Sequence, residues 1–347
     1  MKRHLLFIAA LLIVNLAASA QKKFSVYAVG FYNQENLFDT CHDEGKKDYE
    51  YLPNKGWNGM KYTNKLRNMS KALADMGTDV LPTVGCAFIG LSEVENHKVL
   101  DALVDQAPLK ARNMKYVHIE GPDRRGIDCA LLYNPSLFSV KNVKLLPYVQ
   151  ELAKDSAFFT RGFLTVRGEM AGDDVAVIVC HWPSRFSGPF YRESAARQVK
   201  VIKDSLLNMN QEMKIFVMGD MNDDPVNKSM HVYLQAKPEI SQVGAGDMYN
   251  PWYNVLAKEG KGTLFYSGNW NLFDQIVITP NLLNKDAKKK DYSSLKYWKS
   301  HIFRRDYLIQ QEGQYKGAPL RTTAGGRWLN GYSDHLPVVM YLVKEKK

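Results

Sequence analysis

An acid and an amide follow an apolar run near the middle of the chain. Residues 215–218 have the composition of a strand buried on both faces, and Gly219-Asp220-Met221-Asn222 comes directly after them. Asp220 and Asn222 are two positions apart, so in an extended backbone their side chains share one face. Taken alone, the segment could equally be a polar turn closed by Pro225. Open α/β folds usually keep their sites at such strand ends, which makes the two residues candidates for chemistry.

Polar side chains capable of chemistry recur at the ends of the other apolar, strand-like runs. Each one alone would be an ordinary loop residue, but loop residues are not expected to follow strand boundaries so consistently. The set combines carboxylates, amides and imidazoles, and it contains no thiolate. If the strand ends converge, such oxygen-rich ligands suit Mg²⁺, Mn²⁺ or Ca²⁺ and therefore phosphoryl chemistry. The residues are Asn33, Glu35, Glu93, His181, Asp220, Asn222, Asp274, Asp334 and His335.

From about residue 24 to residue 343, the chain resembles the endonuclease/exonuclease/phosphatase superfamily, which has the DNase I-like fold. Each motif is weak alone, whereas the set in family order is specific. The motifs are Tyr32-Asn33-Gln34-Glu35-Asn36-Leu37-Phe38, Gly90-Leu91-Ser92-Glu93, Arg125-Gly126-Ile127-Asp128, His181-Trp182-Pro183-Ser184, Gly219-Asp220-Met221-Asn222, Phe273-Asp274-Gln275 and Ser333-Asp334-His335. The resemblance implies hydrolysis of a phosphate ester by in-line attack of water, with Mg²⁺ (or Mn²⁺ or Ca²⁺) as the cofactor.

The resemblance also implies a role for each matched residue. Glu93 is expected to be the principal metal carboxylate, with Asn33 and Asp334 beside the metal. Glu35 matches a position that can serve a second metal in some relatives. Asp220 and Asn222 are expected to position the attacking water and the phosphate.

His181 and His335 match the two catalytic imidazoles of the family. Asp274 is expected to orient His335 and to favour its protonated form. By a looser match, Asp128 is expected to do the same for His181. Arg161 and Arg185 are candidate phosphate contacts, although a solvated arginine is a nearly equal alternative for each.

The elements required to position these residues alternate along the chain. Strand-like runs precede each polar cluster, and helical periodicity appears at residues 64–76, 99–104 and 192–207. With no repeat and no linker of unstructured composition, this order predicts a single α/β domain over residues 21–347. The implied fold is a four-layer α/β sandwich of two packed mixed β-sheets flanked by helices.

The N-terminus has the pattern of a secretory signal peptide. Lys2 and Arg3 precede an apolar core at residues 5–14, and Ala18-Ser19-Ala20 forms a small-residue cleavage site. A membrane anchor is the alternative, but the core is short for a span. We therefore expect export to the periplasm or the extracellular space, and no stable membrane insertion.

The charge of the chain favours an anionic substrate. The net charge is +10 over 347 residues, and basic proteins favour nucleic acid, phosphorylated molecules or anionic lipid. Residues 285–305 hold eight Lys/Arg and two acids among aromatic residues, and a lysine-rich loop spans residues 46–65. A basic, aromatic segment can bind nucleic acid but is more often a solvated loop. We therefore expect a secreted nuclease, with no protein partner.

Two alternatives to a nuclease remain. The first is a phosphodiesterase or phosphatase of the same fold that acts on a phospholipid or a small molecule. The second is a catalytically inactive anion-binding protein, against which the complete motif set argues. The four cysteines, Cys41, Cys86, Cys129 and Cys180, form no CxxC pair. Cys129 and Cys180 could be neighbours, and buried free thiols are at least as probable an arrangement.

Overall fold

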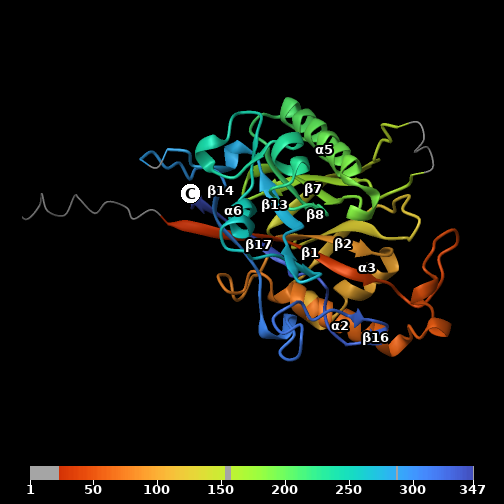
Figure 1. The fold of residues 1–347 in the computed structure, drawn as a ribbon. Coiled ribbons are helices and arrows are strands. Elements are labelled where there is room, and N and C mark those ends of the chain that lie inside the picture. The colour runs from red at the N-terminus through yellow and green to blue at the C-terminus, as the bar shows by residue number, and fades with distance from the viewer. Residues whose placement is uncertain (1–22, 153–157, 287, 347) are drawn as a thin grey trace, which may run out of the picture.

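Two β-sheets pack face to face in the computed structural model of the chain, which describes residues 23–152, 158–286 and 288–346 (Figure 1). The expected signal peptide, residues 1–20, lies outside the described residues. Among the residues that are described, no helix is long and apolar enough to cross a membrane.

The first sheet has six strands in the order β14-β17-β1-β2-β4-β3. Strand β1 lies at its centre, antiparallel to β17 and parallel to β2. Its residues from Ala28 to Asn33 are buried on both faces. The strands are β1 (Phe24–Leu37), β2 (Phe88–Val94), β3 (Lys115–His118), β4 (Asp128–Tyr133), β14 (Lys296–Ile302) and β17 (Val338–Glu345).

The second sheet has seven strands in the order β5-β6-β7-β8-β13-β10-β9. Strands β7 and β8 are parallel, and β13 runs antiparallel to β8. Their bounds are β5 (Phe138–Leu146), β6 (Phe163–Met170), β7 (Asp173–His181), β8 (Lys214–Asp220), β9 (Ala236–Lys237), β10 (Met248–Tyr249) and β13 (Asp274–Ile278).

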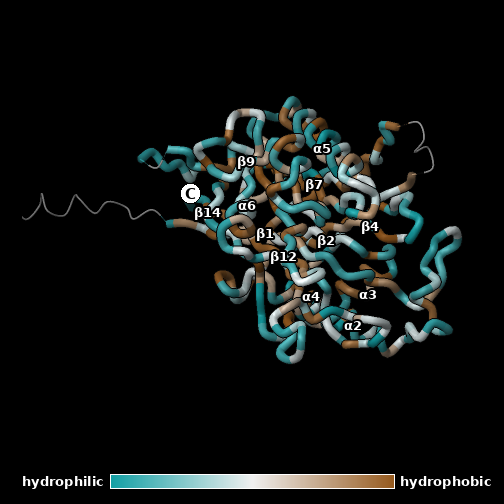
Figure 2. The backbone as a smooth tube through the Cα atoms, viewed as in Figure 1, coloured by the Kyte–Doolittle hydropathy of each residue, from teal (hydrophilic) through white to brown (hydrophobic). Residues whose placement is uncertain are grey.

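The main hydrophobic core lies between the two sheets. Phe88 of β2 contacts Phe216 of β8 edge to face, with ring centroids 5.6 Å apart, and Phe31, Val177 and Met340 belong to the same buried cluster. The apolar residues follow the central strands in Figure 2. Burying each of these side chains contributes about 1.5–3 kcal/mol. The packing therefore fixes the position of one sheet relative to the other, and with it the positions of the strand ends.

Helices cover the outer face of each sheet. Helices α2 (Gly59–Asp75), α3 (His97–Val104) and α4 (Ala107–Ala111) lie on the first sheet, and α5 (Pro189–Met209) lies on the second (Figure 1). This is the four-layer sandwich expected from the sequence. Shorter elements complete the chain: the π-helix η5 (Ser229–Tyr233), helix α6 (Trp252–Ala257), the hairpins β11 (Leu264–Tyr266)–β12 (Asn269–Asn271) and β15 (Thr323–Ala324)–β16 (Arg327–Trp328), and the 3₁₀ turns η1 (Tyr49–Tyr51), η2 (Pro53–Lys55), η4 (Arg185–Ser187), η6 (Ile240–Gln242), η7 (Pro280–Leu282) and η8 (Asp306–Leu308).

The basic segment 285–305 is partly a strand. Residues Lys296–Ile302 form β14, the edge strand beside β17. Lys296 pairs with Val343, so the lysine-rich start of the segment lies at the opposite end of the sheet from Asp334. Two of its basic groups bond carbonyl oxygens of the chain, Lys285 to Val243 and Lys296 to Asn281. The placement of this lysine-rich start therefore gives no support to a role at the site.

The cysteines are all free thiols. Cys41 is exposed, whereas Cys86, Cys129 and Cys180 are buried in the strand layers. Burial raises the pKa of the Cys180 thiol to about 12, so this group stays protonated and unreactive.

Candidate active site

Three of the candidate residues form a row across the second sheet. His181 ends β7 and pairs with Asp220 at the end of β8, and Asp220 pairs in turn with Asp274 at the start of β13. The carboxyl ends of the parallel strands β7 and β8 lie at the same end of the sheet. Strand β13 begins at that end because it runs antiparallel to β8. All three side chains are buried.

Glu93 reaches the same point from the first sheet because β2 is irregular there. The register with β4 shifts between Ser92 and Val94, and Glu93 itself has a left-handed φ of 59°. A bulge of this kind redirects a side chain and costs on the order of 1–3 kcal/mol. The backbone N–H of Asn36 donates to Glu93 Oε2 at 2.9 Å, which holds the redirected carboxylate.

Strain of this type recurs at the site. Glu35, Asn36 and Asn222 also have left-handed backbones, with φ of 46°, 56° and 49°. Such conformations are uncommon for residues other than glycine. They occur here at the strand ends where the predicted motifs lie, which supports a functional reason for each turn.

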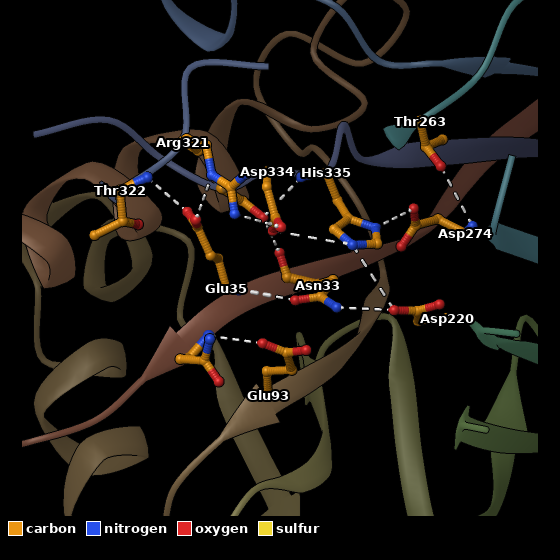
Figure 3. Close-up of polar contacts among 12 residues, drawn as sticks. Asn33, Glu35, Glu93, Asp220, Thr263, Asp274, Arg321, Thr322, Asp334 and His335 are labelled. Carbon is orange, nitrogen blue, oxygen red and sulfur yellow. Dashed lines mark hydrogen bonds and ion pairs between the residues drawn. The ribbon is translucent and has the colours of Figure 1, made fainter. Parts of the chain in front are cut away.

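Asn33 links the two sheets at the centre of the site (Figure 3). Its Nδ2 donates to Asp220 Oδ2 at 3.0 Å, and its Oδ1 accepts from the Glu35 N–H at 2.8 Å. His181 Nε2 lies 3.7 Å from Asp220 Oδ2 and 3.8 Å from Glu93 Oε1. Residues from β1, β2, β7 and β8 therefore meet within a few ångströms, as the sequence predicts.

His335 completes the cluster. Its Nδ1 lies 2.6 Å from Asp274 Oδ2, and its Nε2 is 3.8 Å from Asp220 Oδ2 and 3.9 Å from Asp334 Oδ1. Burial disfavours the charged imidazole, but Asp274, Asp334 and Asp220 outweigh it and raise the pKa of His335 well above its usual value. His335 is therefore protonated at neutral pH, and the expectation that Asp274 orients it matches the geometry.

His181 has the opposite character. Burial, followed by the positive charges of Arg161 and Arg125, lowers the pKa of His181 well below its usual value. Its Nδ1 is buried and has no hydrogen-bond partner among the described residues. The site thus pairs a charged imidazole with a neutral one.

Asp220 is held on both of its oxygens. Oδ1 accepts the Asn222 N–H at 2.9 Å, and Oδ2 accepts the Asn33 amide. Burial raises the pKa of Asp220 from 3.8 to about 7, with His335 opposing the shift and Asp274 adding to it. The Asn222 side chain donates to Trp182 O at 2.9 Å, which ties the turn after β8 to the turn after β7.

Glu35 lies at the edge of the cluster, where an arginine neutralises it. Arg321 Nε donates to Glu35 Oε1 and its Nη2 donates to Asp334 Oδ2, both at 3.1 Å. The Thr322 N–H donates to the other Glu35 oxygen at 2.5 Å. Lys65, fully buried on α2, donates to Thr322 Oγ1 at 2.5 Å and adds positive charge nearby. Glu35 is thus engaged by the protein itself, although the sequence suggests it for a second metal.

Arg321 is a site residue that sequence reasoning missed. It lies in a turn-rich segment with no strand pattern before it, so nothing local marks it. The only available signal is indirect: the buried Glu35 and the half-buried Asp334 require a compensating cation.

The two predicted phosphate contacts lie in different surroundings. Arg161 lines the site pocket, where it bonds Asp123 Oδ2 at 3.0 Å and Trp182 O at 3.1 Å. Arg185 instead bonds Asp224 Oδ2 at 2.8 Å and stacks on Phe273. Its Nε also donates to Asn222 O at 3.2 Å, so it braces the turn that carries Asn222.

Asp128 does not hold His181, and this expectation is wrong. Its carboxylate bonds His118 Nε2 at 3.1 Å and accepts the Gly121 N–H at 3.0 Å. The reason is register: Asp128 starts β4, and its partner Val94 lies just past Glu93 on β2, so the carboxylate is directed to the edge strand β3. Arg125 of the same motif does line the pocket and donates to Asn36 Oδ1.

These groups surround a pocket of about 350 Å³. Glu93, His181, Asp220, Asn222, Asp334 and His335 line it, together with Arg125 and Arg161. Glu93, His181 and Asp220 each offer a ligand atom, and these atoms lie within 4.8 Å of one another. The donor set is rich in oxygen, so a hard divalent cation fits the residues present.

Comparisons with known proteins agree with this fold. The model of the Endonuclease/Exonuclease/phosphatase family matches residues 28–344. An endonuclease/exonuclease/phosphatase family protein from Bacteroides thetaiotaomicron superposes with a TM-score of 0.54 at 14% identity, covering 93% of this chain and 97% of that one. The comparison with curated proteins gives no match.

Two further similar structures are of proteins with a named activity or a bound ligand. The mannosyl-6-phosphatase Bt3783 of Bacteroides thetaiotaomicron gives a TM-score of 0.53 at 14% identity, covering 91% of this chain and 99% of that one. D. rerio TDP2 complexed with single strand DNA product gives 0.53 at 12% identity, covering 92% and 99%. At these identities the likeness shows the fold alone.

Proposed function

Because the chain belongs to the Endonuclease/Exonuclease/phosphatase family, we propose that it is a divalent-metal-dependent phosphoesterase that hydrolyses a phosphodiester by in-line attack of water, with nucleic acid as its substrate. The observation that carries this proposal is the meeting of Glu93, His181, Asp220 and His335 in one pocket. Carboxylates and imidazoles contributed by both sheets are the protein groups that such a reaction needs beside the metal and the attacking water.

We assign the metal to Glu93 as its principal ligand, with Asp220 and His181 within reach and with Asn33 and Asp334 beside it. A Mg²⁺, Mn²⁺ or Ca²⁺ held by these residues would neutralise negative charge on the phosphate. The contacts of Glu35 with Arg321 and Thr322 support a site for one cation rather than two. The positive charge of Arg321 neutralises Glu35 and Asp334 in place of a second cation.

Asp220 is the proposed base for the attacking water. Burial raises the pKa of Asp220 to about 7 in the metal-free chain, and a cation held by Glu93 would oppose that rise and so favour the ionised carboxylate that accepts a proton. Hydrogen bonds from Asn33 and from the Asn222 backbone fix the carboxylate. This fixed orientation lowers the reorganisation needed when water is deprotonated.

The two imidazoles take separate tasks. His335, protonated and held by Asp274, can donate its Nε2 proton to a phosphate oxygen as negative charge develops there. His181, neutral and beside Glu93, can orient the phosphate or the water without adding charge. Arg125 and Arg161 on the pocket wall supply further attraction for an anion.

Nucleic acid as the substrate is supported by the net charge of +10 and by the arginines of the pocket. Two observations count in the other direction. The basic start of the segment 285–305 lies at the far end of the sheet. Residues 59–65, expected to end a lysine-rich loop, instead belong to helix α2, where Lys65 is buried. A small phosphate ester is therefore the second candidate substrate, and the mannosyl-6-phosphatase neighbour belongs to that class.

A substrate panel tests the proposal. The purified chain is incubated with Mg²⁺ or Mn²⁺ and plasmid DNA, RNA, sphingomyelin, inositol phosphates or sugar phosphates, each with and without EDTA. We expect cleavage of nucleic acid that chelation abolishes. Hydrolysis of sugar phosphates alone would replace the nuclease proposal by the second candidate. Binding of phosphate without turnover of any substrate would favour an inactive anion-binding protein.

We also propose export through the signal peptide at residues 1–20, followed by cleavage before Gln21. N-terminal sequencing of the protein secreted by an expressing cell tests this. A retained, uncleaved N-terminus in a cytoplasmic fraction would contradict it.

A further inference from the structure

A second cleft, of about 830 Å³, lies beside the site pocket. Asp334 lines both, and β11 separates them: Leu264 faces the site pocket, whereas residues 265–268 face the cleft. The remaining walls come from the segment that includes Gln310, Gln314 and Tyr315 and from Arg321, Thr323, Ala324 and Gly325. A volume in this range is typical of small-molecule sites.

The hairpin between the two cavities is tied to the catalytic cluster. Leu264 forms a β-bridge with His335, and the Leu336 N–H donates to Thr263 O at 2.8 Å. Phe265 packs on Trp270 across the hairpin, with ring centroids 5.2 Å apart. The cleft wall therefore has a fixed position relative to His335, as a substrate subsite requires.

Two tyrosines expose large aromatic faces at this cleft. Tyr266 is 69% exposed and Tyr315 is 52% exposed, although both are large and partly apolar. They come from separate segments and line the same cavity, together with the amides of Gln310 and Gln314 and the hydroxyls of Ser267 and Thr323. Aromatic faces with neutral hydrogen-bonding groups suit a polar ring.

The charge of the cleft is balanced. Among its lining residues, Arg321 and Asp334 carry charge, and they pair with each other at 3.1 Å. Arg321 is further neutralised by Glu35. A groove for the backbone of a nucleic-acid strand needs an excess of positive charge. The cleft instead favours an uncharged group attached to the phosphate that the site pocket binds.

We propose that this cleft is the subsite for the uncharged polar ring that carries the reacting phosphate, held against Tyr266 and Tyr315. The ring is that of a sugar or of a terminal nucleoside. Both are uncharged, and both have a face that can pack on an aromatic side chain and polar groups at the edge of the ring. The inference rests on the proposed function, because the site pocket must hold the phosphate. The cleft would thus recognise the ring of the substrate, while the reaction takes place at Asp220 in the site pocket.

Non-hydrolysable phosphonates test the subsite without turnover. The Kd values of methylphosphonate, a glucose 6-phosphonate and a thymidine 5′-phosphonate are measured by calorimetry on the Mn²⁺-loaded chain. We expect at least one ring-bearing phosphonate to bind more tightly than methylphosphonate. Tyr266→Ala and Tyr315→Ala should each weaken that ligand about fivefold or more, as loss of ring stacking does, and leave the Kd of methylphosphonate unchanged.

The matched control is Trp298→Ala, which removes another half-exposed aromatic, on β14, away from the cleft. Tighter binding of the glucose ligand alone identifies a sugar ring, and tighter binding of the thymidine ligand alone identifies a nucleoside. Equal affinity of all three phosphonates for the unsubstituted chain, or equal weakening of methylphosphonate by the tyrosine substitutions, would overturn the inference. Ring-dependent binding without hydrolysis of any substrate would leave the subsite intact and refute the proposed function.

Discussion

His335 Nδ1 lies 2.6 Å from Asp274 Oδ2, and both side chains are buried. The two residues are 61 positions apart in the chain, and the fold joins them because β13 starts where the turn before β17 ends. The contact fixes which imidazole nitrogen faces Asp274, so Nε2 is left to face the pocket. It also keeps His335 charged in surroundings that would otherwise remove its proton.

Asp274→Asn should therefore slow hydrolysis by about 10²–10⁴-fold, the usual effect of losing the partner of a catalytic imidazole. The pKa of His335 is raised in the folded chain, so removing the carboxylate lowers it. The alkaline limb of the pH dependence of kcat/KM should then move to lower pH. Asp204→Asn, on the surface of α5, is the control. An unchanged pH profile in Asp274→Asn would contradict the role of this contact.

Asp220→Asn should stabilise the metal-free chain at high pH. The pKa of Asp220 rises from 3.8 in an open chain to about 7 in the fold because of burial. Between these values the folded chain holds a proton that the unfolded chain has released, so its stability falls as pH rises through this window. The side-chain amide of the Asp220→Asn variant carries no charge at either pH. The Tm of this variant should therefore exceed that of the unsubstituted chain by more at pH 8 than at pH 5.

Thermal unfolding in EDTA, followed by circular dichroism, measures this gain. Each unit by which the pKa is raised corresponds to about 1.4 kcal/mol between protonation states, so the difference should be resolved easily. A Tm difference that stays constant from pH 5 to pH 8 would mean that burial does not perturb Asp220.

Glu93→Gln should weaken metal binding more than substrate binding. Glu93 is the acid that the bulge of β2 directs into the pocket, where its Oε1 lies 3.8 Å from the neutral imidazole of His181. Titration calorimetry with Mn²⁺ should show a loss of affinity of at least about tenfold, with a much smaller change in KM at saturating metal. Glu212→Gln, an exposed acid, is the control. Equal metal titrations in both variants would count against the assignment.

Glu35→Gln should affect stability rather than the number of bound cations. Its carboxylate compensates Arg321 and the fully buried Lys65, whose pKa burial lowers to about 8. The Arg321 side chain is 40% exposed and partly screened by solvent, so losing this pair should cost about 1–3 kcal/mol, less than breaking a fully buried pair. Urea unfolding should show a loss of this order, and calorimetry should still count one Mn²⁺ per chain. A lost Mn²⁺ with unchanged stability would return Glu35 to the metal ligands.

Much of the site could be predicted from the sequence because its residues lie at strand ends. A buried strand has a strong apolar signature, and the polar residue that follows it is placed by the strand. Asn33, Glu93, His181, Asp220 and His335 were found in this way, and the structure brings them together. Helix α5 was predicted for the same reason, from its apolar periodicity, and only its ends differ by a few residues.

The missed or misplaced residues depend on features that have no local signature. Arg321 lies in a turn, and its role arises from two acids that are distant in sequence. Asp128 sits in a recognised motif, but the register of β4 against β2 decides which imidazole it meets. Arg185 carries a plausible charge, and only the position of Asp224 and Phe273 shows where that charge is used.

Asp220 and a bound metal are proposed to act in one hydrolytic centre. The most direct test is the rate of phosphodiester hydrolysis by the unsubstituted chain and by Asp220→Asn, each stripped with EDTA and then supplied with Mn²⁺. We expect activity in the unsubstituted chain only after Mn²⁺ is added, and a loss of at least about 10²-fold in the variant, with Mn²⁺ binding retained. Hydrolysis that persists without metal, or that is unaffected by the substitution, would contradict the account.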